Sequence, residues 1–351
     1  MKIQTGCAAL GMVASIAAVT NIQAETLLYV PTGDSNEIIV IDPSDNKITK
    51  RIPELENAHG LAATPDGEYL IAGSQLETGG AEQATAAKPE GVSQDEHEAH
   101  HRESAVSGKS FLSVVNVKHA RVARRIPVEG RTHHIAVSPK GDFAVAVHTT
   151  TGRASIVDLN ASTVIKRIPT GTAPNYAVFD RNGDFVYVSN AGSGTVTKIN
   201  TATWDVAATL SVGKGPEHME FSPDGKTLFV ANVFDNTVSA VTLADGKVAA
   251  TYKVGKAPHG VSVSSDGRYL FVSGKDDNSL ARIDLKAGET VMAAIAPEPY
   301  HVSYIRGLDK LYVSSRAEPK IWVVNPQSLV VETTIDIGSG VAHQMVEVDS
   351  K

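Results

Sequence analysis

Short segments in which apolar and polar residues alternate make up most of the chain, and turn residues separate them. Residues 259–295 show the pattern: HGVSVSS precedes a turn at Asp266 and Gly267, and RYLFVSG, NSLARIDL and ETVMAAI follow. Alternation with a period of two, in runs rich in Val, Ile, Tyr and Phe, predicts β-strands. Runs this short leave no room for a long helix, so the pattern predicts an all-β chain.

The same arrangement recurs along the sequence. The turn after the first strand reads TPDG (64–67), SPKG (138–141), DRNG (180–183), SPDG (222–225) and SSDG (264–267), and the last three intervals are each 42 residues. A sixth copy with an altered turn covers 299–313, and a seventh fragment, GVAHQMVEVDSK, ends the chain. A fixed period of this length predicts a β-propeller with one four-stranded sheet per repeat.

The two ends complete one repeat between them. The C-terminal fragment holds only a first strand, whereas residues 26–52 hold only a second, third and fourth. Six full repeats and this shared one predict a seven-bladed β-propeller that spans 25–351 and is closed by pairing of its terminal strands, which removes exposed sheet edges.

The first interval between turns is 74 residues rather than 42, because residues 76–108 are inserted between the second and third strands of blade one. Gly, Ala, Ser and charged residues dominate this insertion, which predicts a flexible segment.

The first 24 residues carry Lys2, an apolar run and NIQA before Glu25, the pattern of a secretory signal peptide. We therefore expect a periplasmic or secreted protein without a membrane span, since no stretch reaches the roughly 18 apolar residues that a spanning helix needs. Cleavage after Ala24 removes Cys7, the one cysteine, and so excludes disulfides, thiolate metal sites and thiol nucleophiles.

The net charge of −7 becomes −8 once the signal and its single lysine are removed. An acidic chain without a basic cluster is a poor binder of nucleic acid or anionic membranes, so the expected partners are a metal ion or small molecule and a periplasmic protein.

Four phrases at matching places in the repeat, YVPT (29–32), YVSN (187–190), FVAN (229–232) and YVSS (312–315), resemble the YVTN family of β-propellers. The resemblance implies a seven-bladed propeller. That family is similar to the haem-binding propeller of cytochrome-type nitrite reductases. It is more distantly similar to the propellers of nitrous oxide reductase and thiocyanate dehydrogenase, in which histidines near the channel hold copper. The resemblance implies no single activity, because propellers with unrelated functions share this fold.

Histidines occupy one of two adjacent positions at the start of the innermost strand in every blade except the third. They are His59, His133, His134, His218, His259, His301 and His343. Neutral imidazole is the commonest side-chain ligand of zinc, copper and iron, so the pattern predicts a transition-metal site at the channel mouth, with copper favoured and haem as an alternative.

Further candidates lie in the same register or in the insertion. Glu217, Tyr176 and Tyr300 are candidates for acid, base or hydrogen-bonding roles. In the insertion, His97, His100 and His101 have a spacing that brings them to one face of a helix and suits ligands in a lid over the ring.

The sequence is compatible with three functions. The first is a propeller that binds a transition metal or metallocofactor for handling or electron transfer. The second is a copper- or haem-dependent oxidoreductase acting on a small molecule. The third is an interaction scaffold in which the histidines brace neighbouring blades.

Overall fold

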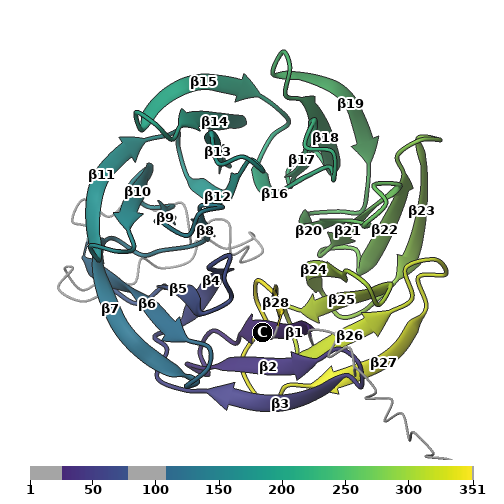
Figure 1. Ribbon diagram of the computed structural model, residues 1–351. Coiled ribbons are helices and arrows are strands. Elements are labelled where there is room, and N and C mark those ends of the chain that lie inside the picture. The colour runs from purple at the N-terminus through teal and green to yellow at the C-terminus, as the bar shows by residue number, and fades with distance from the viewer. Residues whose placement is uncertain (1–25, 78–107, 350–351) are drawn as a thin grey trace, which may run out of the picture.

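The computed structural model describes residues 26–77 and 108–349, and their strands form seven four-stranded antiparallel sheets around a central axis (Figure 1). The described residues contain no helix. The predicted seven-bladed propeller is therefore confirmed. The proposed signal peptide, and all of the insertion except residues 76, 77 and 108, lie outside the described residues.

Each sheet contributes one strand to each of four concentric layers. The innermost strands are β4 (Ala58–Ala63), β8 (Ile135–Val137), β12 (Pro174–Phe179), β16 (Pro216–Phe221), β20 (Pro258–Val263), β24 (Pro299–Ile305) and β28 (Val346–Asp349). The second strands are β5 (Tyr69–Ser74), β9 (Phe143–His148), β13 (Phe185–Asn190), β17 (Thr227–Asn232), β21 (Tyr269–Gly274), β25 (Lys310–Ser315) and β1 (Thr26–Pro31). The third strands are β6 (Lys109–Asn116), β10 (Arg153–Asp158), β14 (Thr195–Asn200), β18 (Thr237–Thr242), β22 (Ser279–Asp284), β26 (Lys320–Val324) and β2 (Ile38–Asp42). The outermost strands are β7 (Arg121–Glu129), β11 (Thr163–Pro169), β15 (Asp205–Ser211), β19 (Lys247–Lys253), β23 (Glu289–Ala294), β27 (Val331–Asp336) and β3 (Lys47–Ile52).

Both ends of the chain close the ring in one sheet. β28 pairs antiparallel with β1, and this register places Thr26 opposite Asp349 and Tyr29 opposite Val346. Figure 1 shows the two strands side by side, purple beside yellow. The innermost strand thus comes from the C-terminus and the other three strands from the N-terminus, as the sequence predicts.

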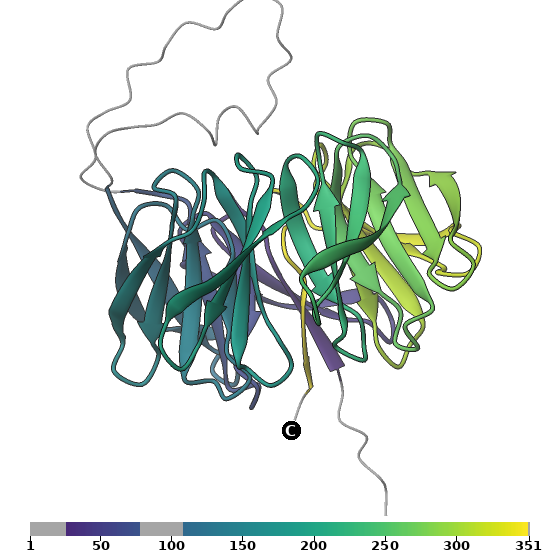
Figure 2. The same ribbon diagram turned by 90° about the horizontal axis from the view of Figure 1, so that it is seen from above.

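The SPDG-type turn links the first and second strands of a blade through a compact hydrogen-bond network. In blade four, Ser222 Oγ donates to Asp224 (2.6 Å) and accepts the N–H of Thr227 (3.0 Å). Gly225 follows with φ of 69°, in the left-handed region that glycine adopts without strain. These turns lie at one end of the ring, called here the turn face; the opposite end, where the innermost strands begin, is the histidine face. Figure 2 views the ring from the side, with strands running between these two faces.

The hydrophobic core lies between neighbouring blades. In one cluster, Val145 and Val147 of β9 pack with Val186 and Val188 of β13 in the next blade. Each blade therefore completes its core only against its neighbours, as expected for repeat proteins. Among the described residues, no helix is long and apolar enough to cross a membrane.

Candidate metal centre

A β-bulge recurs at the start of the innermost strands. In blade five, Pro258 pairs with Gly274 and Val261 with Val272, so three steps along β20 match two along β21. The same shift occurs in β4, β12, β16 and β24. A bulge sets two residues opposite one and re-aims their side chains. Both of the adjacent positions that carry histidine can therefore contribute to the channel.

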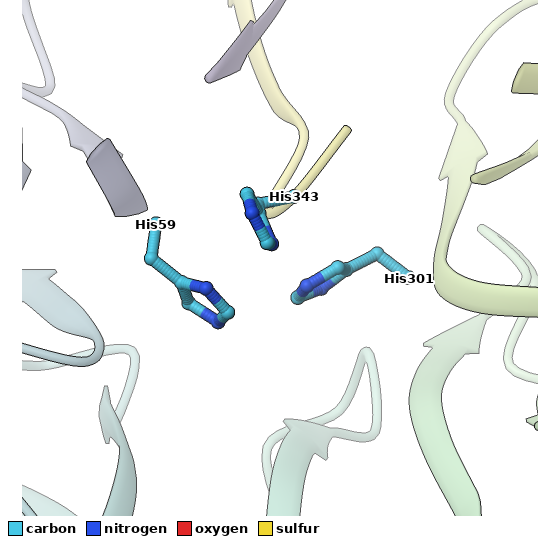
Figure 3. Close-up of side chains that lie close together, drawn as sticks. All are labelled: His59, His301 and His343. Carbon is cyan, nitrogen blue, oxygen red and sulfur yellow. The ribbon is translucent and has the colours of Figure 1, made fainter. Parts of the chain in front are cut away.

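The structure brings all seven ring histidines into one buried cluster. Their side chains are between 0% and 6% exposed, and neighbouring ring centroids lie 4.0–4.9 Å apart. Figure 3 shows His59, His301 and His343 pointing toward one another from three different blades. His133 and His134, which the sequence leaves as alternatives for the channel position, both belong to the cluster.

Three triads within the cluster have the spacing of metal ligands: His59–His301–His343, His59–His133–His134 and His134–His218–His301. In each, one nitrogen per ring lies within 4.8 Å of the others. Every pair of triads shares one histidine. Because a neutral imidazole offers a single lone-pair nitrogen, the three triads cannot all be filled at once by neutral rings.

The hydrogen bonds of His134 fix which of its nitrogens can bind a metal. Its Nδ1 lies 3.0 Å from the carbonyl oxygen of Asn175 and 2.8 Å from Nδ1 of His133, and we assign the proton to Nδ1 of His134 because the carbonyl oxygen can only accept. The lone pair is then on Nε2, which lies 3.1 Å from Nε2 of His218. Two nitrogens bound to one ion at roughly 2.0–2.1 Å are themselves about 3 Å apart, so these two already have the spacing of co-ligands.

Two further rings present nitrogens that make no hydrogen bond. Nε2 of His59 and Nε2 of His301 are buried and have no hydrogen-bond partner among the described residues. A buried polar atom of this kind costs free energy unless a ligand satisfies it.

Burial disfavours the charged form of four of the ring histidines. It lowers the pKa of His59, His134, His218 and His301 well below the usual 6.5, and repulsion from neighbouring histidines adds to the effect. These four rings are therefore neutral near pH 7, which is the state that binds metal ions.

Glu217 holds His259 in position. Its Oε2 accepts a hydrogen bond from Nδ1 of His259 at 2.7 Å, and the Tyr300 ring stacks on His259 at 4.0 Å between centroids. A carboxylate on one ring nitrogen directs the other toward a metal and raises its basicity. Of the three candidates for acid–base chemistry, Glu217 thus lies in the position of an orienting group.

The two candidate tyrosines form walls of the cluster. Tyr176 packs 4.5 Å from His218 between ring centroids, and its hydroxyl accepts a hydrogen bond from Gln344. Burial raises the pKa of both Tyr176 and Tyr300, so their hydroxyls remain protonated near neutral pH.

Glycine at the second of the two adjacent positions lets the blades approach closely. A Cβ on Gly260 would lie 2.5 Å from the backbone nitrogen of Val302 and 2.6 Å from the carbonyl oxygen of Tyr300. Gly60 meets the backbone of His133 and His134 in the same way. These two blades therefore carry their histidine at the first position.

His148 lies at the end of β9 on the histidine face but is a brace rather than a ligand. Its Nδ1–H donates to the carbonyl oxygen of Arg131 at 3.0 Å, and its Nε2 accepts the Ser155 hydroxyl at 2.8 Å. Asn190 and Asn232 occupy the equivalent position in the next two blades, and their side-chain amides donate to the hydroxyls of Thr197 and Ser239 on the next strand. His97, His100 and His101 lie outside the described residues.

A polar cavity of about 170 Å³ continues from the cluster toward the turn face. His218 and His301 lie at the end nearest the cluster. Glu220, Glu347 and Arg306 line the part nearer the turn face. Burial raises the pKa of Glu220 and of Glu347 to about 7. Sequence reasoning did not single these residues out. The signal was there, since Glu220 follows His218 by two residues and so shares its side of the strand.

The fold and the cluster together define a seven-bladed β-propeller with a buried histidine centre. Residues 198–309, about a third of the chain, match the family model described as "Lactonase, 7-bladed beta-propeller". No curated protein matches the chain in sequence.

Solved structures share the architecture. The chain is similar to the Pseudomonas aeruginosa periplasmic gluconolactonase PpgL, with a TM-score of 0.71 and 17% identity over 92% of this chain and 99% of that one. It is similar to Kuenenia stuttgartiensis hydrazine synthase, with a TM-score of 0.63 and 18% identity over 84% and 86%. It is also similar to the dihydro-heme d1 dehydrogenase NirN in complex with DHE, with a TM-score of 0.62 and 15% identity over 93% and 67%. At these identities the likeness shows the fold alone.

Proposed function

We propose that this protein is an exported β-propeller that binds transition-metal ions, copper foremost, through its buried histidine cluster. One observation carries the proposal: seven buried imidazoles from six blades converge in the channel, and six of them form triads whose nitrogen atoms have ligand spacing. A purely structural role would require each ring to be satisfied by protein groups, and Nε2 of His59 and Nε2 of His301 are not, among the described residues.

The triad His134–His218–His301 would hold the first ion. His134 presents Nε2 because its Nδ1 is committed to Asn175, His218 lies beside it, and His301 has an unsatisfied Nε2. His59, His133 and His343 would remain for a second ion, since neutral rings cannot serve two ions at once. His259, whose ring lies 4.3 Å from that of His218 and 4.9 Å from that of His301 between centroids, would be an additional ligand of the first ion.

The donor set favours copper or zinc over other metals. All of the ligands are imidazole nitrogens, which suit Cu, Zn, Fe and Ni, and the affinity order places Cu(II) highest. Bound copper would supply one-electron redox chemistry, which fits a role in electron transfer or metal handling. The protein itself orients the rings, through Glu217 and Asn175, and excludes bulk water from them.

A haem fits the described residues less well. The cavity that reaches the cluster is about 170 Å³. That is below the roughly 300–1,000 Å³ of typical small-molecule and cofactor pockets. The rings also pack against one another, with centroids as close as 4.0–4.3 Å. A haem would have to lie above the histidine face, and we therefore favour bare metal ions.

The test is elemental analysis with absorption and electron paramagnetic resonance spectra of the untagged protein from its native compartment. We expect near-stoichiometric copper that is lost in His134→Ala/His301→Ala and retained in the control His119→Ala, whose histidine lies in an exposed turn. Protein that carries no metal and also refuses added Cu(II) and Zn(II) would contradict the proposal and favour an interaction scaffold with a protein partner.

Lactone hydrolysis is a second candidate, favoured by the family model that covers residues 198–309. These residues include Glu217 and His259, a carboxylate–imidazole pair of the kind that activates water. Hydrolysis of gluconolactone, followed by acid release, decides between the two. Turnover that Glu217→Gln abolishes, in protein stripped of metal, would support the lactonase function.

A further inference from the structure

The channel cavity below the cluster connects the metal centre with the turn face. The end of the cavity nearest the histidine face is lined by His218 and His301, two members of the first-ion triad. His301 is 2% exposed, and its Nε2 has no hydrogen-bond partner among the described residues. The side chain that carries this unsatisfied nitrogen therefore lines the cavity.

Side-chain amide, carboxylate and hydroxyl groups line the cavity one after another between the histidines and the turn face. Gln344 spans the channel just below the histidines: its Nε2 donates to Tyr176 Oη at 3.1 Å, and its Oε1 accepts the N–H of Leu61 at 3.2 Å. Next come the Glu220 carboxylate and Ser303, and Glu347 and the exposed Arg306 lie near the opening.

The carboxylates are held by backbone groups that leave them beside the cavity. Glu220 Oε2 accepts the N–H of Val263 at 3.2 Å, and Glu347 Oε2 accepts the N–H of Arg306 at 3.3 Å. Each carboxylate has further lone pairs beyond those bonds. A hydrated cation must shed water before imidazoles can bind it, and carbonyl, amide and carboxylate oxygens can replace that water in steps.

We propose that this channel is the uptake route of the metal centre, in which a divalent transition-metal ion enters from the turn face and passes Glu347 and Glu220 to reach His218 and His301. The inference rests on the proposed metal binding. It assigns the two glutamates a role in the rate of loading, not in the final coordination.

The experiment compares loading rates of metal-free protein mixed with Cu(II) in stopped flow, followed by the copper–imidazole absorption. Ser303→Phe narrows the channel, and Glu220→Gln/Glu347→Gln removes its charge while keeping an oxygen acceptor. We expect the loading rate of both variants to be lower by about tenfold or more, because charged clefts focus ions, and their copper content at equilibrium to be unchanged.

Matched controls are placed at the other end of the ring. Thr150 lines a small cavity beside His133 on the histidine face, and Glu318 is exposed in the β25–β26 connection on that face. Thr150→Phe and Glu318→Gln should load at the wild-type rate.

The outcomes separate the two proposals. Wild-type protein that binds no copper at equilibrium contradicts the proposed function and the route with it. Normal equilibrium binding with wild-type rates in both channel variants contradicts the route alone, as does slow loading confined to Thr150→Phe. Thermal unfolding of each variant verifies that it is folded.

Discussion

The carboxylate of Glu217 and the imidazole of His259 face each other across a blade boundary, with 2.7 Å between Oε2 and Nδ1. The Glu217 side chain is completely buried. A buried carboxylate is costly unless a partner compensates it, so this contact joins the stability of two blades to the orientation of a candidate ligand.

Glu217→Gln should weaken copper binding by about 10- to 100-fold, because an amide neither orients nor activates His259 as a carboxylate does. Competition with a copper chelator measures the affinity. Glu318→Gln, an exposed change on the same face, serves as the control. Unchanged affinity in Glu217→Gln would mean that His259 is not a ligand.

Saturating metal should stabilise the native protein. A ligand present at a thousand times its Kd and bound only by the folded state adds about 4 kcal/mol to the free energy of unfolding. Differential scanning calorimetry with and without Zn(II) should therefore show a rise in Tm of several degrees. The rise should vanish in His134→Ala/His301→Ala, and its persistence there would place the bound ion elsewhere.

Without metal, stability should fall as pH drops below 6.5. Histidines that are buried in the neutral form become protonated on unfolding at such a pH. Each one lowers the free energy of unfolding by about 1.4 kcal/mol for every pH unit below its unfolded pKa. Glu220 and Glu347 act in the opposite sense, since their raised pKa of about 7 removes stability as pH rises from 4.5 to 7. The histidines with a lowered pKa outnumber these two glutamates, so the net trend follows the histidines.

His148 allows this linkage to be tested on one residue outside the cluster. Burial lowers its pKa from 6.5 to about 4, so it destabilises the fold progressively between those pH values. His148→Asn introduces the residue that β13 and β17 carry at the same position. Between pH 7 and pH 5, urea unfolding of the variant should lose about 2 kcal/mol less stability than that of the wild type. An unchanged dependence would contradict the assignment.

Gly260→Ala should displace the innermost strand of blade five, because its Cβ would meet the backbone of β24 at 2.5 Å. We expect a loss of about 1–3 kcal/mol in the free energy of unfolding and weaker copper binding. Gly288→Ala is the matched control: nothing lies within 4 Å of its Cβ, so it should bear only the cost of its positive φ and bind copper normally. Equal copper affinity in both variants would contradict the role of Gly260.

The repeat spacing was sufficient to predict the seven blades, because the turn at Ser222–Gly225 and its counterparts depend on local hydrogen bonds that the sequence displays directly. Closure of the ring by the two termini was predicted from the number of strands at each end, one at the C-terminus and three at the N-terminus. Both predictions rest on contacts between residues near in sequence or on a fixed period.

The details of the cluster depend on geometry that the period does not contain. A strand without irregularity would turn His133 and His134 to opposite sides. In blade two the N–H of His133 donates to the carbonyl oxygen of Val147 at 2.9 Å and the N–H of Val147 donates to that of His134 at 3.0 Å, so both histidines lie opposite one residue, as in a bulge. The role of His148 was hidden because Ser155 lies on the next strand. Glu347 gave no signal because its neighbours in the channel, Glu220 and Arg306, come from distant blades.

The pairing of β28 with β1 also sets a time order for assembly. The last cluster histidine, His343, directly precedes β28, and its backbone N–H bonds the carbonyl oxygen of Pro31 at 3.0 Å, at the end of β1. A chain still being synthesised lacks this ligand until residue 343 has been made, however well its other blades have formed. The complete set of seven imidazoles therefore arises only when β1 and β28 meet, so a metal-loaded centre would report that the propeller has closed.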